Sequence, residues 1–202
     1  MAMVLTPAAG PRAPTPSPGV VWTRAHRDAI PDERSRWEII DGVLCMTPAP
    51  ATPHQRIVLQ LSVLLHAAIE ARALPLDVMP APVDVWGSDE DVVQPDLLVC
   101  RRDDAADPGH VDVGRVLLAI EITSPRSRAR DLRRKSDWYR RHGVPAYWVI
   151  DLEDGSATER TETGRRRAVP TLVWRPAPGA EPVTVDVAVL LERARIRPSA
   201  TR

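Results

Sequence analysis

The run RVLLAIEI at residues 115–122 restricts the fold more than any other feature of this sequence. Its residues are apolar at successive positions, so both faces of the segment must be covered, as in a central strand between two layers of helix. Glu121 interrupts this run. A carboxylate in such surroundings must be ion-paired, protonated or bound to a metal, because an unpaired buried charge is costly.

Two helices and several strands surround this segment. Apolar residues at three- and four-residue spacing predict a helix over 53–72, with Thr52 as its N-cap. A second helix is expected over 131–142, ended by Gly143 in the left-handed conformation. The expected strands cover residues 76–86, 92–100, 115–122 and 145–151. This order predicts an α/β fold, a mixed β-sheet flanked by helices.

The remaining elements are shorter. WEIIDGVLCM, residues 37–46, places an Asp41-Gly42 turn between two β-prone runs, which is typical of a hairpin. We expect edge strands near 157–163, 170–175 and 182–187, and a short helix near 188–195.

Length and composition favour one globular domain. The chain has 202 residues with 44% hydrophobic content, enough for one core, which we place at 20–196. Residues 1–19 are rich in Pro and Ala and are predicted to be a disordered leader, with a flexible tail over 197–202. No secretory signal or membrane span is recognisable, so we expect a soluble, cytoplasmic protein. Cys45 and Cys100 have no zinc-like spacing, which argues against a structural zinc.

Charge is unevenly distributed although the net charge is zero. Residues 77–112 contain ten acids and two arginines, whereas residues 126–141 contain eight bases and two acids. Zero net charge argues against a protein that simply coats nucleic acid. An acidic segment beside a basic one suits a site that holds a divalent cation next to a phosphate, and it also suits solvated loops.

Two acids are candidate metal ligands. Asp96, in QPDLLVC, stands at a strand start, and Glu121 lies in the apolar run. On adjacent strands their oxygens can converge on one Mg²⁺, with the carbonyl of Ile122 as a third ligand. Two simpler interpretations stay open. Asp96 after a proline suits a turn, and Glu121 suits a buried pair with an arginine.

Lys135 is the only lysine among 27 basic residues. It lies four residues after Asp131 and four before Tyr139, so the three share one helix face. An ammonium is a compact charge whose pKa moves with burial, whereas a guanidinium is a broad fork that stays protonated. Chemistry beside a metal can require the former, although a single lysine also arises by chance, and Asp131 can simply cap the helix and pair with it.

An ordered series of motifs resembles a known family. WEIIDG, His54 at the start of a helix, QPD, EITSP, RDLRRKSDWY and GVPAYWVID are similar to the Uma-type restriction endonuclease family of the PD-(D/E)XK nuclease superfamily. The similarity spans residues 35–152. The resemblance implies a restriction-endonuclease-like fold and a Mg²⁺- or Mn²⁺-dependent nuclease that acts on DNA.

The resemblance also assigns roles to residues. It implies that Asp96 and Glu121 bind the metal, that Lys135 is the catalytic lysine, and that Glu38 is an additional acid. The superfamily's usual lysine stands two residues after the acid, where this sequence has Thr123. Activity therefore depends on Lys135 reaching back from the helix.

Four further residues are candidate substrate ligands: His54, Arg130, Arg134 and Tyr139. His54 could approach a phosphate, or it could be a surface residue in the first helical turn. The arginines could contact phosphates, or they could form a solvated face. Tyr139 could stack on a base, although aromatic residues at helical spacing are more often core.

The preferred hypothesis is a metal-dependent phosphodiesterase acting on DNA. A nuclease fold that binds nucleic acid or a partner without cutting it is the alternative, which Thr123 and the zero net charge favour. A third is a nuclease-like subunit that becomes active only within a mobile-element or defence complex. By analogy with restriction-like folds we assume a homodimer.

Overall fold

A computed structural model describes residues 20–31, 35–47, 50–102, 109–123, 130–161 and 164–194. The predicted leader over 1–19 and tail over 197–202 lie outside these ranges. The helical elements are α1 (Arg24–Asp28), α2 (Thr52–Glu70), the 3-10 turn η1 (Val113–Arg115), the π-helical turn η2 (Arg130–Lys135), α3 (Ser136–Arg141) and α4 (Val187–Ala194). None of the described helices is long and apolar enough to cross a membrane.

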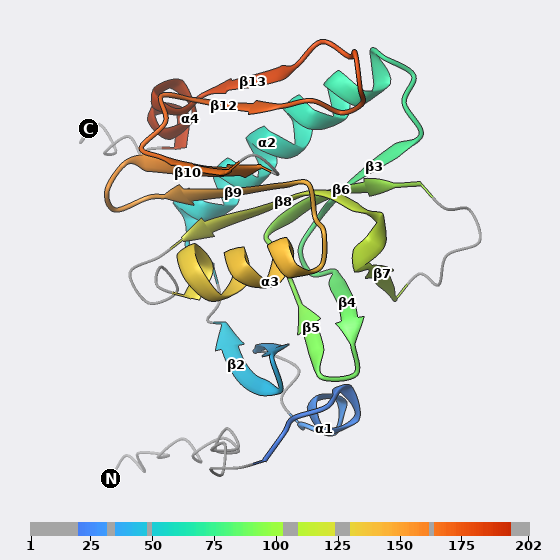
Figure 1. Cartoon of the computed structure of the whole chain (residues 1–202). Helices are drawn as coiled ribbons and strands as arrows, with labels where there is room; N and C mark the ends of the chain where they lie inside the picture. Colours follow the sequence, from blue (N-terminus) through green and yellow to red (C-terminus); the bar gives the residue numbers. More distant parts are fainter. Residues whose placement is uncertain are drawn as a thin grey trace, which may run out of the picture.

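The described strands form three sheets (Figure 1). The six-stranded sheet runs in the order β11 (Gly164–Arg167), β10 (Ser156–Thr161), β9 (Ala146–Asp151), β8 (Val116–Thr123), β6 (Leu97–Arg101) and β3 (Leu76–Pro80). The five-stranded sheet runs β2 (Val43–Thr47), β1 (Arg36–Ile40), β5 (Asp91–Val93), β4 (Asp84–Ser88) and β7 (His110–Asp112). A third sheet pairs β12 (Thr171–Trp174) with β13 (Val183–Asp186).

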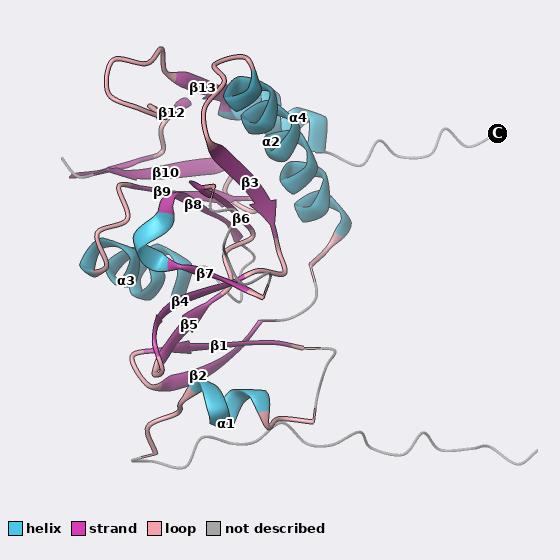
Figure 2. Cartoon of the chain, turned by 90° about the vertical axis from the view of Figure 1, so that its right-hand side faces the viewer, coloured by secondary structure: helices cyan, strands magenta, loops and turns pink. Residues whose placement is uncertain are grey.

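The predicted central strand is confirmed. β8 pairs antiparallel with β6 and parallel with β9, so the six-stranded sheet is mixed. Leu118 and Ile120 join the core formed with α2, whereas Ala119 joins the core formed with Trp138 of α3. Figure 2 shows α2 and α3 on opposite sides of this sheet. Successive apolar residues in β8 therefore cover both of its faces.

The predicted extents of two strands were wrong. The segment 76–86 divides into β3 and β4, and 92–100 divides into β5 and β6. In each case the two halves belong to different sheets. Pro82 and Pro95 stand at the breaks, and a proline cannot donate a hydrogen bond to continue a ladder. At each of these breaks the chain passes from one large sheet to the other.

The helices are confirmed with corrections at their starts. α2 begins at Thr52, and its N-cap is Ala51, so Thr52 is a helical residue. The helix predicted over 131–142 consists of η2 followed by α3, and Gly143 after it has a φ of +73° as expected. A π-helical turn inside a helix is frequently found at a functional site.

Other differences concern short elements. The hairpin with its turn at 41–42 is confirmed as β1 and β2, and the short C-terminal helix as α4. The strand expected at an edge near 157–163 is β10, which lies between β9 and β11. The sequence did not predict β11, because GRRR carries no β-type pattern, nor did it predict α1 and β7.

Gly87 allows β4 to approach α3 closely. A Cβ atom at this position would lie 2.7 Å from Cζ2 of Trp138 and 2.8 Å from Nε2 of His142. Trp138 also donates a hydrogen bond of 2.8 Å from Nε1 to Oδ1 of Asp91. These contacts fix α3, and with it η2, against the five-stranded sheet.

Candidate active site

Asp96 and Glu121 lie side by side at the end of two adjacent strands. Leu97 of β6 pairs with Ile120 of antiparallel β8, which places Asp96 opposite Glu121 and on the same face of the sheet. Oδ2 of Asp96 accepts a hydrogen bond of 2.9 Å from the backbone N–H of Ile122. The side chains are buried, with exposed fractions of 3% and 4% for the two residues. The structure therefore brings together the two acids predicted as metal ligands.

Lys135 joins these acids from the other layer of the fold. Its Nζ lies 2.7 Å from Oε1 of Glu121 and 2.7 Å from Oε1 of Glu38. The residue is only 1% exposed. A buried ammonium between two carboxylates has lost its hydration, so Lys135 is not an accidental replacement of a surface arginine. The sequence alternative that pairs Glu121 with an arginine is replaced by this pair with lysine.

Glu38 comes from β1 of the five-stranded sheet. Its Oε1 accepts a hydrogen bond of 2.7 Å from the backbone N–H of Gln94, and its Oε2 accepts one of 2.9 Å from Oγ1 of Thr47. The resemblance alone suggested this acid, and the structure places it against Lys135. The cluster thus lies where the two large sheets meet, beside the link from β5 to β6.

Asp96 also contacts two basic side chains. Nε2 of His54, at the start of α2, lies 3.0 Å from its Oδ2, and Nη2 of Arg36 donates to its Oδ1 at 3.0 Å. His54 was predicted to approach a phosphate, and here it contacts a metal-ligand candidate. Arg36 was missed. Arg36 precedes Glu38 by two residues on β1, so the alternation of side chains along a strand puts both on one face. This spacing was the sequence signal that could have identified Arg36.

The two acids have opposite pKa shifts. Burial acts to raise the pKa of Asp96, but the hydrogen bond and charge of His54, the charge of Arg36 and the N–H of Ile122 outweigh it and lower the pKa to about 2. Burial raises the pKa of Glu121 well above its usual value. Lys135 opposes that rise, while the neighbouring carboxylates of Asp96, Asp131 and Glu38 add to it. A cation near Glu121 would relieve this crowding.

Two of the remaining predicted substrate ligands, Arg134 and Tyr139, have contacts with the backbone and with an aromatic ring. Nη2 of Arg134 donates a hydrogen bond of 3.0 Å to the carbonyl of Ile40, which ties η2 to β1. Tyr139 is fully buried and its ring centroid lies 4.9 Å from that of Tyr147, which favours its interpretation as a core residue. Only the backbone of Arg130 is described, as the first residue of η2.

Thr123 stands two residues after Glu121, where the resemblance implies a lysine. It is 1% exposed and pairs in register with Asp151 at the ends of parallel β8 and β9. Its hydroxyl has no hydrogen-bond partner within the described parts of the chain. The ammonium that reaches Glu121 comes instead from η2.

The donor atoms of the cluster suit a hard divalent cation. Mg²⁺ prefers carboxylate and carbonyl oxygens, which Asp96, Glu121 and the backbone of Ile122 offer. Across the ranges that the structure describes, no three acidic, His or Cys side chains converge as ready-made ligands. Lys135 lies between Glu38 and Glu121, and Asp96 is engaged by Arg36 and His54. The donor set fits the metal, provided that Lys135 shifts toward one acid.

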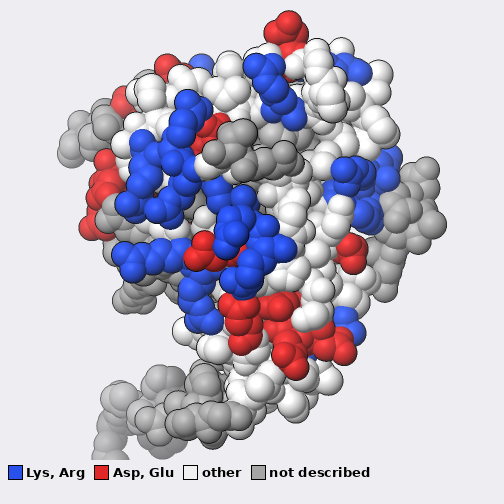
Figure 3. Space-filling view, viewed as in Figure 1, with Lys and Arg blue, Asp and Glu red and all other residues white. Residues whose placement is uncertain are grey.

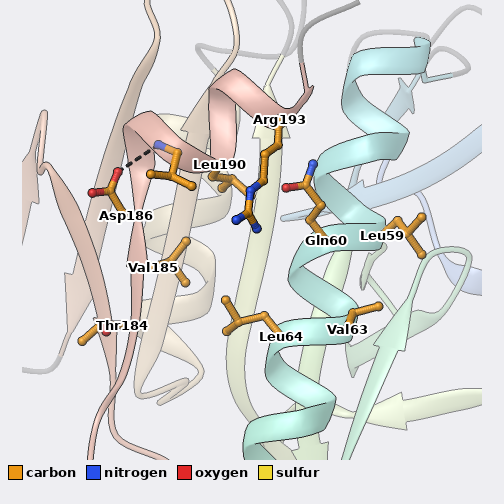
Figure 4. Close-up of a pocket in the computed structure, with 10 residues that line it drawn as sticks. Leu59, Gln60, Val63, Leu64, Thr184, Val185, Asp186, Leu190 and Arg193 are labelled. Carbon is orange, nitrogen blue, oxygen red and sulfur yellow. Dashed lines mark hydrogen bonds between the residues drawn. The ribbon is translucent and has the colours of Figure 1, made fainter.

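A groove of about 420 Å³ between α2 and α4 has a different character (Figure 4). Its lining is mainly aliphatic, including Leu59, Val63 and Leu64, with Asp186 and Arg193 at its margin. Asp186 accepts a hydrogen bond of 2.9 Å from the backbone N–H of Val189. The described residues that line this groove include no cluster of acids, and they belong to the opposite side of the six-stranded sheet from Lys135.

Comparison with known proteins identifies the family and the fold of this chain. Residues 23–187 match the family described as "Uma2: Putative restriction endonuclease". A crystal structure of a putative nuclease of the DUF820 group from Anabaena variabilis superimposes with a TM-score of 0.70 at 15% identity, covering 86% of this chain and 99% of that one. No curated protein matches the chain. Since the family match covers most of the sequence, this chain belongs to the Uma2 restriction endonuclease family and has a nuclease-like α/β fold.

Proposed function

We propose that the protein is a metal-dependent endonuclease that hydrolyses phosphodiester bonds in DNA. The observation that carries the proposal is the buried cluster in which the ammonium of Lys135 meets Glu121, directly across the strands from Asp96. A nuclease of this kind needs acids to hold a cation and a compact positive charge beside the reacting phosphate. Family membership supports the same reaction class.

Asp96, Glu121 and the carbonyl of Ile122 would hold Mg²⁺ or Mn²⁺. When bound there, the cation lowers the pKa of a water molecule and neutralises charge on the phosphate. Arg36 and His54 keep Asp96 ionised and fix its orientation through contacts of 3.0 Å. Asp96 is therefore ready to bind a cation at any pH near neutrality.

Lys135 orients the attacking water and stabilises the negative charge that develops on the phosphate. Glu38 positions this ammonium, and Thr47 and the backbone of Gln94 hold Glu38 in turn. Because Glu38 is bound by three donors, we assign it a positioning role, whereas Glu121 is free to exchange Lys135 for the cation. Each residue of the cluster thus has one defined task.

The test is nicking of supercoiled plasmid with Mg²⁺ or Mn²⁺ and with EDTA. We expect Asp96→Asn and Glu121→Gln to lose cleavage, and Glu70→Gln, an exposed acid at the end of α2, to cleave like the wild type. Cleavage that persists in EDTA, or in both site variants, would contradict the proposal. Circular dichroism of each variant separates a lost site from a lost fold.

Two observations favour a second function, binding without cleavage. Thr123 stands where the resemblance implies a lysine, and Lys135 is held by two contacts of 2.7 Å. A protein whose lysine stays locked between Glu38 and Glu121 would bind nucleic acid without cutting it. In that case the wild type would bind duplex DNA equally in EDTA and in Mg²⁺, and no plasmid would be nicked under either condition.

A further inference from the structure

A groove lined by arginines lies on the outer side of α3. It has a volume of about 710 Å³ and runs between η2 and α3 on one side and β10 and β11 on the other. Its basic lining residues are Arg133, Arg140, Arg160 and Arg165, and Asp137 adds an acid to the lining. Figure 3 shows basic side chains gathered on this face of the molecule, where α3 lies in Figure 1.

Arg160 is the unusual member of this set. It is only 6% exposed, and its Nη2 donates a hydrogen bond of 3.2 Å to the carbonyl of Val144. Within the described ranges its Nε has no hydrogen-bond partner, and no carboxylate there forms an ion pair with it. A buried cation without a counter-ion is costly in a folded protein, which points to an anion supplied by a ligand.

The chemistry of the lining narrows the kind of anion. A guanidinium presents a planar fork that pairs with two oxygens of a phosphate. Arg133, Arg140 and Arg165 are exposed and come from different elements, so their charges are spread along the groove. Several separated guanidinium groups suit successive phosphates of a strand better than one isolated phosphate.

We propose that this groove binds the phosphodiester backbone of the DNA substrate, with Arg160 at its base and the exposed arginines along its sides. The proposal rests on the function proposed above and adds a second contact with the substrate, outside the carboxylate cluster. Arg133 and Lys135 both belong to η2, so the same helical turn carries a groove residue and the catalytic lysine. Binding in the groove would fix the strand relative to the cluster.

The experiment measures binding of a labelled 20-bp DNA duplex in EDTA at several KCl concentrations, so that no cleavage is needed. For the variant Arg133→Gln/Arg140→Gln/Arg165→Gln we expect affinity at low salt to fall about tenfold or more. The negative slope of log K against log salt should become shallower by about 2 to 3, roughly one for each phosphate that the variant no longer neutralises. Asp137→Asn should bind more tightly, because it removes an acid from the groove.

The matched control is Arg101→Gln/Arg175→Gln/Arg193→Gln, which removes three exposed arginines outside the groove. If both triple variants lose the same affinity, only net charge matters, and the groove is not a site. The proposal would also be overturned if the first triple variant bound DNA with the same affinity and the same salt slope as the wild type. If the wild type cleaves plasmid but the first triple variant binds DNA as the wild type does, only the groove proposal fails. If DNA binding depends on the groove arginines but the wild type cleaves no plasmid, only the proposed nuclease function fails.

Arg160 is tested by two variants, since its truncation can unfold the domain. Arg160→Lys keeps the charge but loses the fork, so we expect several-fold weaker binding with an unchanged salt slope. If the circular dichroism of Arg160→Gln matches that of the wild type, this variant should make the negative salt slope shallower by about one. A free-phosphate site would give a different result: millimolar inorganic phosphate would raise the melting temperature of the wild type but not of Arg160→Lys, and DNA affinity would be equal in the two.

Discussion

Nζ of Lys135 lies 2.7 Å from Oε1 of Glu121, and both side chains are buried between the six-stranded sheet and η2. The lysine therefore serves as counter-ion to an acid that we propose as a metal ligand. Removal of Lys135 should therefore affect folding as well as the proposed chemistry. Experiments on this residue must measure the two effects separately.

Replacing Lys135 with arginine should remove activity while keeping charge. The wider fork cannot occupy the point between Glu38 and Glu121 without displacing one of them. We expect the rate of metal-dependent plasmid nicking to fall about 100-fold or more, the size associated with loss of one preorganised electrostatic group. Affinity for duplex DNA should be unchanged, because the net charge is conserved. Equal nicking rates in Lys135→Arg and the wild type would refute the catalytic role.

Replacing Lys135 with methionine should make stability depend on the metal. The substitution leaves Glu38 and Glu121 without their shared ammonium, and loss of one partner of a buried pair costs about 3 kcal/mol or more. Mg²⁺ can take the place of the lost charge, so it should raise the free energy of unfolding more in the variant than in the wild type. Urea titrations with EDTA and with Mg²⁺ measure this difference. An equal effect of Mg²⁺ on both proteins would contradict the replacement of the ammonium by a cation.

Asp96 should contribute stability that is lost in acid. Its pKa is lowered from 3.8 to about 2 in the folded protein. The contribution is therefore present in full above the unfolded value and disappears as the pH falls from about 4 to 2. Its size is about 2 kcal/mol. Urea unfolding in EDTA across this range should show a steeper loss in the wild type than in Asp96→Asn, and parallel curves would contradict the assignment.

Gly87 should be more sensitive to substitution than Gly143. Gly87→Ala forces a methyl group against Trp138 and His142, and overpacking of this kind costs about 1 to 3 kcal/mol. A Cβ at Gly143 would meet no atom within 4 Å, so only its positive φ of +73° opposes alanine, at about 1 kcal/mol. Thermal unfolding ranks the two variants. Gly87→Ala should also slow cleavage, because α3 and η2 must move away from β4.

Much of the fold could be predicted because its elements have strong local patterns. The apolar run of β8, the spacing along α2 and the turn at 41–42 each specify one structure from a few neighbouring residues. The breaks at Pro82 and Pro95 were missed because their consequence is a change of sheet, which depends on partners far away in the sequence.

The same distinction applies to the candidate site. Glu121 was identified as a charge inside an apolar run, and Lys135 as a unique residue type, and both signals are local. Arg36 was not identified, because one arginine among 26 gains meaning only when β1 lies beside Asp96. Arg160 was missed for a similar reason, since the burial of β10 depends on β11 and on the loop before β9.

The carboxylate cluster draws Glu38 from one large sheet and Asp96 and Glu121 from the end of the other. Neither sheet alone carries the complete set of residues, and Lys135 arrives only when η2 packs against both. A chain that is still emerging from the ribosome, with β8 and η2 not yet made, therefore lacks the complete cluster. Competence for the proposed cleavage is in this way a late product of folding, acquired when the two large sheets dock.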